Sequence, residues 1–470
     1  MPAHYERLSF LDNTFLAMEG PGNPMHVAAT LVFDGESLRD EGGVDIELLR
    51  SFVAARLQYL PRYRQRLEWI PIERHPVWVD DDHFDIEYHV RHTALPHPGT
   101  TQQLRELAGS ILSQRLDRSK PLWQAWAVEG LEDGRVALIT KVHHCMIDGM
   151  GGVDLLKVLL APVRTDDVGE ADDFEPRPVP LRSQLFFDEV RRRSRMPAEA
   201  FRNLRQFVDD TKELGDEVRH RVMAMTHTVR SGWFSNASET PLNGTIGPNR
   251  RIAWLVSDLA EVKQVKDAMG ATVNDVVIAA VAGAVRTFLT KDRAVDVDSL
   301  DFRAMVPVST RPDGSGGDLG NQVTMWLVDL PVSDPDPSAR LRAVTASTAH
   351  LKETNQALGA AMLTQSASFT PSTVLSAAAR VAAATARPFN MTITNVPGPQ
   401  VPLYMLGARL EEIFPLVPLW VNHGLGVALF SYDGRLDWGF GADRDLVPDL
   451  DVFVDRVREA LDELVTAATS

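Results

Sequence analysis

Residues 143–148 read His-His-Cys-Met-Ile-Asp, and Gly149 follows them. Just before the two histidines, residues 136–142 read "VALITKV", which predicts a β-strand. Val136, Leu138, Thr140 and Val142 would lie on one face of it, and Ala137, Ile139 and Lys141 on the other. Neighbouring side chains on an extended backbone point to opposite sides, so only one of His143 and His144 can face a given cavity. The glycines that follow predict a tight loop leading into a helix. We therefore expect one histidine to carry chemistry and the other to support it.

Three kinds of chemistry use histidines in such a loop, and the sequence distinguishes between them. A metal site would need a third ligand and a spacing such as H-E-x-x-H, which is missing from the segment. A nucleophilic pair of Cys145 with a histidine is conceivable, although adjacent residues rarely reach hydrogen-bond geometry with each other. A general-base histidine oriented by Asp148 is the remaining alternative, and an imidazole pKa of about 6.5 suits it.

Composition limits the classes of function. The chain has 470 residues, 44% of them hydrophobic, and a formal net charge of −16, which argues against nucleic acid as a partner. Its one cysteine excludes an internal disulfide framework and any multi-cysteine metal cage. The first residues do not resemble a signal peptide, and we expect neither a membrane-spanning segment nor an exported protein. We expect a cytoplasmic location.

The chain divides into three parts by pattern. Strand-like and helix-like segments alternate over residues 1–165, which predicts an N-terminal α/β lobe. An acidic, proline-bearing stretch and a basic helical connector fill 166–245, and alternation resumes over 246–470 as a second α/β lobe. The arginine-rich residues 189–196 of the connector indicate either a solvated helix face or a surface that meets anionic lipid.

Residues 143–149, "HHCMIDG", match the H-H-x-x-x-D-G motif of the superfamily that includes chloramphenicol acetyltransferase and peptide-synthetase condensation domains. Further segments narrow the likeness: "LSFLDNTFLAMEGPGNPMHVAA", "KPLWQAW", "ATVNDVVIA", "VPVSTRPD", "LGNQVTMWLVDLP" and "ITNVPGP". In this order they resemble the bacterial wax ester synthase and acyl-CoA:diacylglycerol acyltransferase family. The likeness covers nearly the whole chain.

The resemblance implies two chloramphenicol acetyltransferase-like lobes with the active-site channel between them. It implies transfer of a fatty acyl group from acyl-CoA to diacylglycerol or a fatty alcohol, without a cofactor or metal. His144 would be the general base and His143 its support. Asp148 would pair with an arginine to hold the loop, for which Arg311 is a candidate, and Gly149 would let substrate approach the backbone.

Other family motifs carry weaker assignments. Asn274 and Asp275 match the family's Asn-Asp motif, which makes Asn274 a candidate donor to the oxyanion. As a structural alternative, Asn274 is the N-cap of the following helix and Asp275 lies in its first turn. Pro121, Leu122 and Trp123 match the Pro-Leu-Trp motif, for which we favour a packing role.

Two other functions stay open at this stage. The histidine motif alone also permits a condensation-type enzyme that uses the thioester of a carrier protein. A non-catalytic lipid-binding protein on the same fold is a third hypothesis. The neighbouring motifs favour the lipid acyltransferase, and the basic connector could bring such a protein to a membrane or a lipid droplet.

Overall fold

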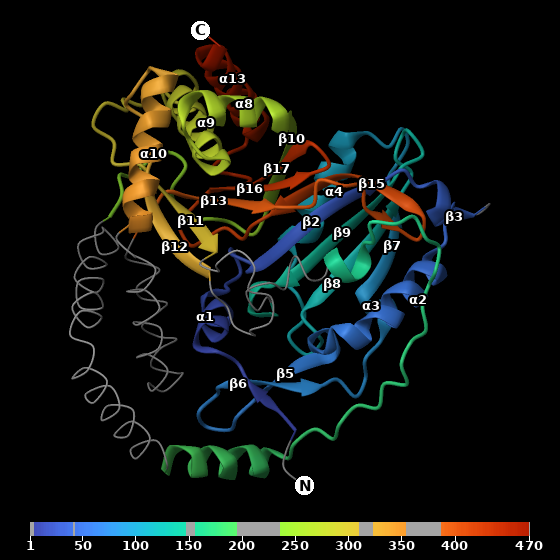
Figure 1. The fold of residues 1–470 in the computed structure, drawn as a ribbon. Coiled ribbons are helices and arrows are strands. Elements are labelled where there is room, and N and C mark those ends of the chain that lie inside the picture. Colours follow the sequence, from blue (N-terminus) through green and yellow to red (C-terminus); the bar gives the residue numbers. More distant parts are fainter. Residues whose placement is uncertain are drawn as a thin grey trace, which may run out of the picture.

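The computed structural model describes residues 4–40, 43–146, 156–194, 236–309, 323–353 and 387–469. Two six-stranded mixed sheets form the two lobes, as the sequence predicts (Figure 1). The first sheet has the strand order β14-β15-β2-β9-β8-β7 and the second has the order β10-β17-β16-β13-β11-β12. A small three-stranded sheet, β1-β6-β5, lies beside the first lobe.

The strands of the first sheet are β2 (His26–Phe33), β7 (Val90–Ala94), β8 (Trp123–Glu129), β9 (Val136–His143), β14 (Tyr404–Met405) and β15 (Ala408–Leu416). Those of the second are β10 (Arg250–Asp258), β11 (Arg303–Ser309), β12 (Val323–Asp329), β13 (Met391–Pro397), β16 (Leu425–Tyr432) and β17 (Arg435–Asp443). The small sheet contains β1 (Glu6–Arg7), β5 (Gln65–Trp69) and β6 (Pro76–Asp80).

The main helices are α1 (Phe10–Met18), α2 (Ile46–Arg56), α3 (Ile86–His89), α4 (Thr101–Ser113), α8 (Leu259–Met269), α9 (Val273–Thr287), α10 (Pro337–Glu353) and α13 (Leu450–Thr469). Helices α8, α9, α10 and α13 gather on one side of the second sheet (Figure 1). Helices 46–56 and 101–113 lie in residues 1–165, and helix 273–287 lies in residues 246–470, the two parts for which the sequence predicts alternating strands and helices.

The two sheets do not follow the order of the chain. Strands β14 and β15, from residues 404–416, complete the edge of the first sheet, where β15 pairs antiparallel with β2. The division at residues 165 and 246 remains a prediction from composition, and the sheets cross it. The insertion of β15 beside β2 joins the C-terminal part of the chain to the first sheet through backbone hydrogen bonds, which side-chain patterning does not reveal.

Helix α4 lies between the first sheet and strand β10 of the second. Leu104, Ala108 and Ile111 of α4 share a buried cluster with Ile252 of β10 and with side chains of β2 and β9. A Cβ atom added at Gly109 would lie 2.9 Å from the carbonyl oxygen of Arg250, so the helix and the strand are in close backbone contact. The lobes are therefore packed tightly together at this point.

Helix α9 forms the core of the second lobe. Its N-cap is Thr272, whose hydroxyl accepts from the N–H of Asp275, while the Asp275 carboxylate accepts from the N–H of Thr272. The prediction of Asn274 as N-cap is wrong, because this reciprocal capping box starts the helix two residues earlier. The segment Val273–Asp292 has the length and hydropathy of a membrane span, but most of it is buried inside the second lobe.

The connector begins as an irregular segment tied to the first lobe. Residues 164–181 have no regular structure, and ion pairs Arg64–Asp172 and Arg177–Asp80 hold them there. Residues 182–194 are helical. Leu185 of this helix packs against Ile70, Val77 and Val79 of the small-sheet region. The linker is therefore exposed, as predicted, but anchored.

Candidate active site

Strand β9 delivers the two histidines to the junction of the lobes. It ends at His143, and His144 begins the short 3₁₀ turn His144–Met146. The N–H of His143 donates to the carbonyl of Leu122 (2.9 Å), and that of His144 donates to the carbonyl of Met25 (2.8 Å). His143 is fully buried while His144 keeps part of its surface. The two neighbours thus occupy different surroundings, as the alternation predicts.

His144 has the properties of a neutral base. Its ring stacks on Phe15 with centroids 3.9 Å apart, and its buried Nδ1 has no hydrogen-bond partner within the part of the chain that the structure describes. Burial lowers the pKa of His144 to about 4. The imidazole is therefore uncharged at neutral pH and able to accept a proton.

His143 supports the turn that carries His144. Its Nδ1 accepts the N–H of Cys145 (3.1 Å), which places the ring proton on Nε2. That Nε2 lies 3.6 Å from Oε1 of Glu19 at the end of α1. The other carboxylate oxygen of Glu19 accepts from Nη2 (2.7 Å) and Nε (3.1 Å) of Arg118. Arg118, Glu19 and His143 thus form a chain of contacts ending at the turn.

Five ionisable side chains form what we call the buried polar centre: Glu19, His26, Arg118, Lys141 and His143. His26 lies opposite His143 in the β2–β9 ladder, with its Nε2 3.5 Å from Oε1 of Glu19. Burial lowers the pKa of both histidines well below the usual range, and lowers that of Lys141 to about 8. Burying such groups is unfavourable unless they are paired, so a cluster directly behind His144 indicates a functional constraint.

The sequence prediction missed Glu19 and Arg118, although Glu19 lies within the quoted family segment "LSFLDNTFLAMEG". Residues 19, 118 and 143 are far apart in the sequence, and their spacing does not predict a contact. The end of a helix, a loop and the end of a strand bring them together in the fold. His26 of β2 also belongs to the centre, and no sequence motif singles it out. It is buried, but its Nδ1 lacks a partner among the described residues.

Cys145 does not have the character of a nucleophile. Its side chain is buried in the first-lobe core, and burial raises the pKa of the thiol well above its ordinary value. Only the thiolate attacks a carbonyl, so the environment keeps this cysteine unreactive. The geometry disfavours the covalent Cys–His alternative.

Pro121, Leu122 and Trp123 have the packing role that we favoured. Trp123 is buried, stacks on His89 with centroids 4.6 Å apart, and donates from Nε1 to the carbonyl of Tyr63 (2.8 Å). The carbonyl of Leu122 also accepts the N–H of His143, so this motif helps to fix the end of β9.

An apolar wall from the second lobe faces the histidine turn. Phe15, stacked on His144, lies 6.0 Å between ring centroids from Trp420, which in turn contacts Phe389. Met305 and Leu327 of β11 and β12 are buried in the same cluster. His423 stacks on Phe389, and both its ring nitrogens face carbonyl oxygens, so it is a core residue.

The remaining predicted site residues have other positions. Asp148, Gly149 and Arg311 lie outside the described residues. Asp275 is engaged in the α9 capping box and accepts from Oγ1 of Thr348 (2.7 Å), which fits a structural role. Within the described ranges, no hydrogen bond joins Asn274 or Asp275 to His144, and no group of His, Cys, Asp or Glu side chains is arranged to hold a metal.

Two mixed sheets, the first completed by strands from the C-terminal half, with a histidine pair at the end of β9, define a two-lobed acyltransferase of the chloramphenicol acetyltransferase type. The wax ester synthase/diacylglycerol acyltransferase catalytic domain matches residues 8–277, and the C-terminal domain of the same family matches 319–465. The chain belongs to the wax ester synthase/diacylglycerol acyltransferase family.

Individual proteins agree with this assignment. A putative diacylglycerol O-acyltransferase of Mycobacterium tuberculosis (strain H37Rv) is 35% identical, over 98% of this chain and 91% of that protein. The wax ester synthase/diacylglycerol acyltransferase from Marinobacter aquaeolei VT8 superposes with a TM-score of 0.69 at 26% identity, covering 99% and 100% of the two chains. A starter condensation domain of rhizomide synthetase, 11% identical with a TM-score of 0.60 over 99% and 95%, shares the fold.

Proposed function

We propose that this protein transfers a long fatty acyl group from acyl-CoA to the hydroxyl of diacylglycerol or of a long-chain alcohol, forming triacylglycerol or a wax ester. The observation that carries the proposal is His144, an uncharged imidazole directly after β9 whose Nδ1 has no partner among the described residues, where the two lobes meet. Relatives named diacylglycerol O-acyltransferase favour diacylglycerol as one acceptor.

The chemistry needs only proton transfer and stabilisation of charge, because a thioester is already activated. His144 removes the hydroxyl proton as the acceptor oxygen attacks the thioester carbonyl. The tetrahedral intermediate then collapses, the carbon–sulfur bond breaks, and the imidazolium returns its proton to the leaving thiolate of coenzyme A. General-base catalysis of this kind contributes on the order of 10² to 10⁴ in rate.

The surroundings of His144 suit a fatty substrate. Phe15 of α1 stacks on the ring of His144, and Trp420 with the second-lobe residues Phe389, Met305 and Leu327 continues this apolar region. Excluding water there protects the acyl group from hydrolysis and strengthens local electrostatic interactions. The oxyanion donor that the family pattern assigns to Asn274 remains part of the proposal.

Release of free thiol from palmitoyl-CoA tests the proposal. The purified protein is assayed with 1,2-dioleoylglycerol, with hexadecanol and without an acceptor. We expect release that depends on an acceptor, with triacylglycerol or wax ester detected by mass spectrometry. Folded protein that releases no thiol with either acceptor would contradict the function and favour a carrier-protein thioester or lipid binding without catalysis.

We also propose that helix 182–194 brings the enzyme to a lipid surface, either the cytoplasmic face of the membrane or a lipid droplet. Glu73 and Glu189 neutralise Arg192 and Arg193, so the support comes from apolar side chains. Leu181, Phe187 and Val190 expose 66%, 67% and 50% of their surface. Flotation with neutral-lipid emulsions should weaken in Phe187→Ser/Val190→Ser, whereas unchanged flotation would exclude this helix as the contact.

A further inference from the structure

A polar groove of about 480 Å³ lies between helix α4 and strand β10, on the seam of the two lobes. Arg105 and Ser113 from α4 form part of one wall, and Arg250 and Arg251 from β10 form part of the other. Arg444, just after β17, completes the basic lining. A cavity of this size is in the range of small-molecule sites, and its polar walls do not suit an acyl chain.

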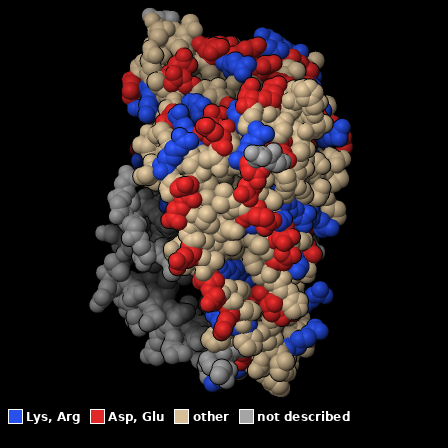
Figure 2. Space-filling model, turned by 90° about the vertical axis from the view of Figure 1, so that its right-hand side faces the viewer, with Lys and Arg blue, Asp and Glu red and all other residues tan. Residues whose placement is uncertain are grey.

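The charge of the groove is opposite to that of the protein. Four arginines line it against two carboxylates, those of Glu106 and Asp451, in a chain whose net charge is −16. The acidic and basic side chains on the face drawn in Figure 2 are interspersed, and its described residues form no extended basic area. A local excess of arginine in such a protein indicates a ligand with negative charge.

Two of these arginines retain hydrogen-bonding capacity. The Nε atoms of Arg105 and Arg251 are buried and lack an acceptor among the described residues. Arg105 otherwise binds Asp451 (2.8 Å), and Arg250 lies 3.7 Å from Asp443. Buried donors are usually satisfied in folded proteins, and an acidic oxygen of a ligand in the groove would satisfy these two.

The groove reaches the back of the buried polar centre. Nη2 of Arg250 donates to the carbonyl of Gly22 (2.5 Å), three residues before Met25, which accepts the N–H of His144. On the other wall, the carbonyl of Gln114 accepts from Nζ of Lys141 (2.8 Å), two residues before His143. Three residues span at most about 11 Å, so the inner end of the groove is close to the catalytic turn.

We propose that this groove binds the phosphate groups of coenzyme A, with Arg251 and Arg444 as direct contacts and Arg105 as a further donor. The inference rests on the proposed use of acyl-CoA and adds the position of its nucleotide end. When the thioester of acyl-CoA lies at His144, its pantetheine arm places the phosphates some way from the base. The arginines of the groove are also separated from His144, so they are positioned for those phosphates. Arginine is the residue best suited to bind phosphate oxygens.

The test uses Arg251→Ala and Arg444→Ala, alone and together, with Arg342→Ala as a matched control. Arg342 is an exposed arginine on α10 and does not line the groove. Arg250 is left intact because it holds Gly22. Each variant is assayed with palmitoyl-CoA, palmitoyl-dephospho-CoA and S-palmitoyl-pantetheine, and binding of free coenzyme A is measured by calorimetry.

We expect each groove substitution to raise KM for palmitoyl-CoA about 10-fold and to weaken free coenzyme A binding by a similar factor, since a charged hydrogen bond is lost. KM for S-palmitoyl-pantetheine should not change, and dephospho-CoA shows which phosphate is bound. The proposal would be wrong if the groove variants had the wild-type KM for palmitoyl-CoA. It would also be wrong if their KM for S-palmitoyl-pantetheine rose by the same factor as their KM for palmitoyl-CoA.

Two further outcomes separate this inference from the proposed function. Coenzyme A binding that is lost in Arg251→Ala/Arg444→Ala supports the groove even if no acceptor is turned over. If phosphatidylglycerol vesicles bind less to the double variant while coenzyme A binds equally to both proteins, the groove is a site for lipid headgroups and the proposal is wrong.

Discussion

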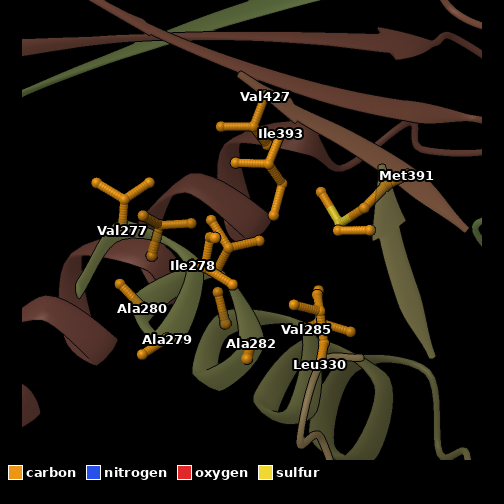
Figure 3. Close-up of a cluster of buried hydrophobic side chains, with 14 of the residues drawn as sticks. Val277, Ile278, Ala279, Ala280, Ala282, Val285, Leu330, Met391, Ile393 and Val427 are labelled. Carbon is orange, nitrogen blue, oxygen red and sulfur yellow. The ribbon is translucent and has the colours of Figure 1, made fainter. Parts of the chain in front are cut away.

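Helix α9 and the end of strand β9 are both enclosed by protein, yet the side chains around them have opposite chemistry. From Val276 to Val285 every residue of α9 is buried and apolar or glycine (Figure 3). Around His143, by contrast, Glu19, His26, Arg118 and Lys141 are ionisable. Apolar burial stabilises by roughly 25 cal/mol per Å², whereas burial of ionisable groups is unfavourable unless they are paired. The second lobe therefore supplies the stable scaffold, and the first keeps a polar centre that chemistry requires.

The largest effect should come from removing the base. His144→Ala should lower turnover of palmitoyl-CoA with diacylglycerol by about 10²- to 10⁴-fold. Melting temperature and circular dichroism should stay close to those of the wild type, because the side chain is partly exposed and its Nδ1 forms no hydrogen bond within the described part of the chain. Turnover like that of wild type in a folded variant would exclude His144 as the base.

The apolar side of the comparison predicts the reverse pattern. Ile278→Ala, in the centre of α9, should lower the free energy of unfolding by about 2–5 kcal/mol, because it leaves a cavity in a fully buried cluster. Chemical denaturation measures this change. KM and kcat at a temperature where the variant is folded should stay near wild-type values. A fall in kcat there would show that the scaffold and the site are coupled.

Glu19 tests whether the polar centre positions the base. Glu19→Gln leaves the charge of Arg118 uncompensated and loosens His143, so we expect kcat to fall by about 10- to 100-fold while KM changes little. Glu19→Asp should recover part of the loss. The matched control is Asp437→Asn, a buried carboxylate of β17 that accepts from the N–H of Ile413 (2.9 Å) and whose pKa burial raises to about 7.

With a pKa of about 7, Asp437 is in large part protonated at neutral pH, and asparagine resembles that protonated form, so this control should retain most of the activity. Equal losses of kcat in Glu19→Gln and Asp437→Asn would show that burying any altered carboxylate disturbs the enzyme, and that Glu19 has no special role. A rise in KM alone for Glu19→Gln would also contradict a positioning role.

The sequence predicted the apolar half of this comparison better than the polar half. The pattern of residues 136–142 predicted β9, and the alternation of strand-like and helix-like segments predicted the two lobes. These features depend on neighbouring residues. The contact of Glu19 with His143 and the insertion of β15 beside β2 depend on residues far apart in the chain, and neither leaves a local pattern.

The pH dependence of catalysis should reflect the burial of His144. Because burial lowers the pKa of His144 to about 4, the neutral base is already formed above about pH 5, and kcat/KM should stay level from there to neutrality. An exposed histidine would instead give an acid limb near pH 6.5. Such a limb, measured with acyl-CoA in protein that regains full activity at pH 7, would contradict this prediction.

The stability of the fold should also decrease when the pH is lowered from neutrality toward 5. His26 and His143 bind protons in the folded protein only well below the ordinary pKa, whereas the unfolded chain binds them near 6.5. Acidification below about pH 6.5 therefore favours the unfolded state, and the melting temperature should decrease from there. The activity measurement needs this control because unfolding also removes turnover.

The smallest effect should come from Cys145→Ala. The thiol is buried and its pKa is raised, so it supplies no thiolate, and the contact that Cys145 makes with Nδ1 of His143 comes from the backbone N–H, which alanine retains. We expect kcat within about two-fold of wild type and a modest loss of stability from the smaller side chain. Trapping with an acyl-CoA substrate should yield no acylated protein by mass spectrometry. A folded but inactive Cys145→Ala variant would instead show that the polar centre works through a covalent thioester, and His144 would then serve to activate the thiol.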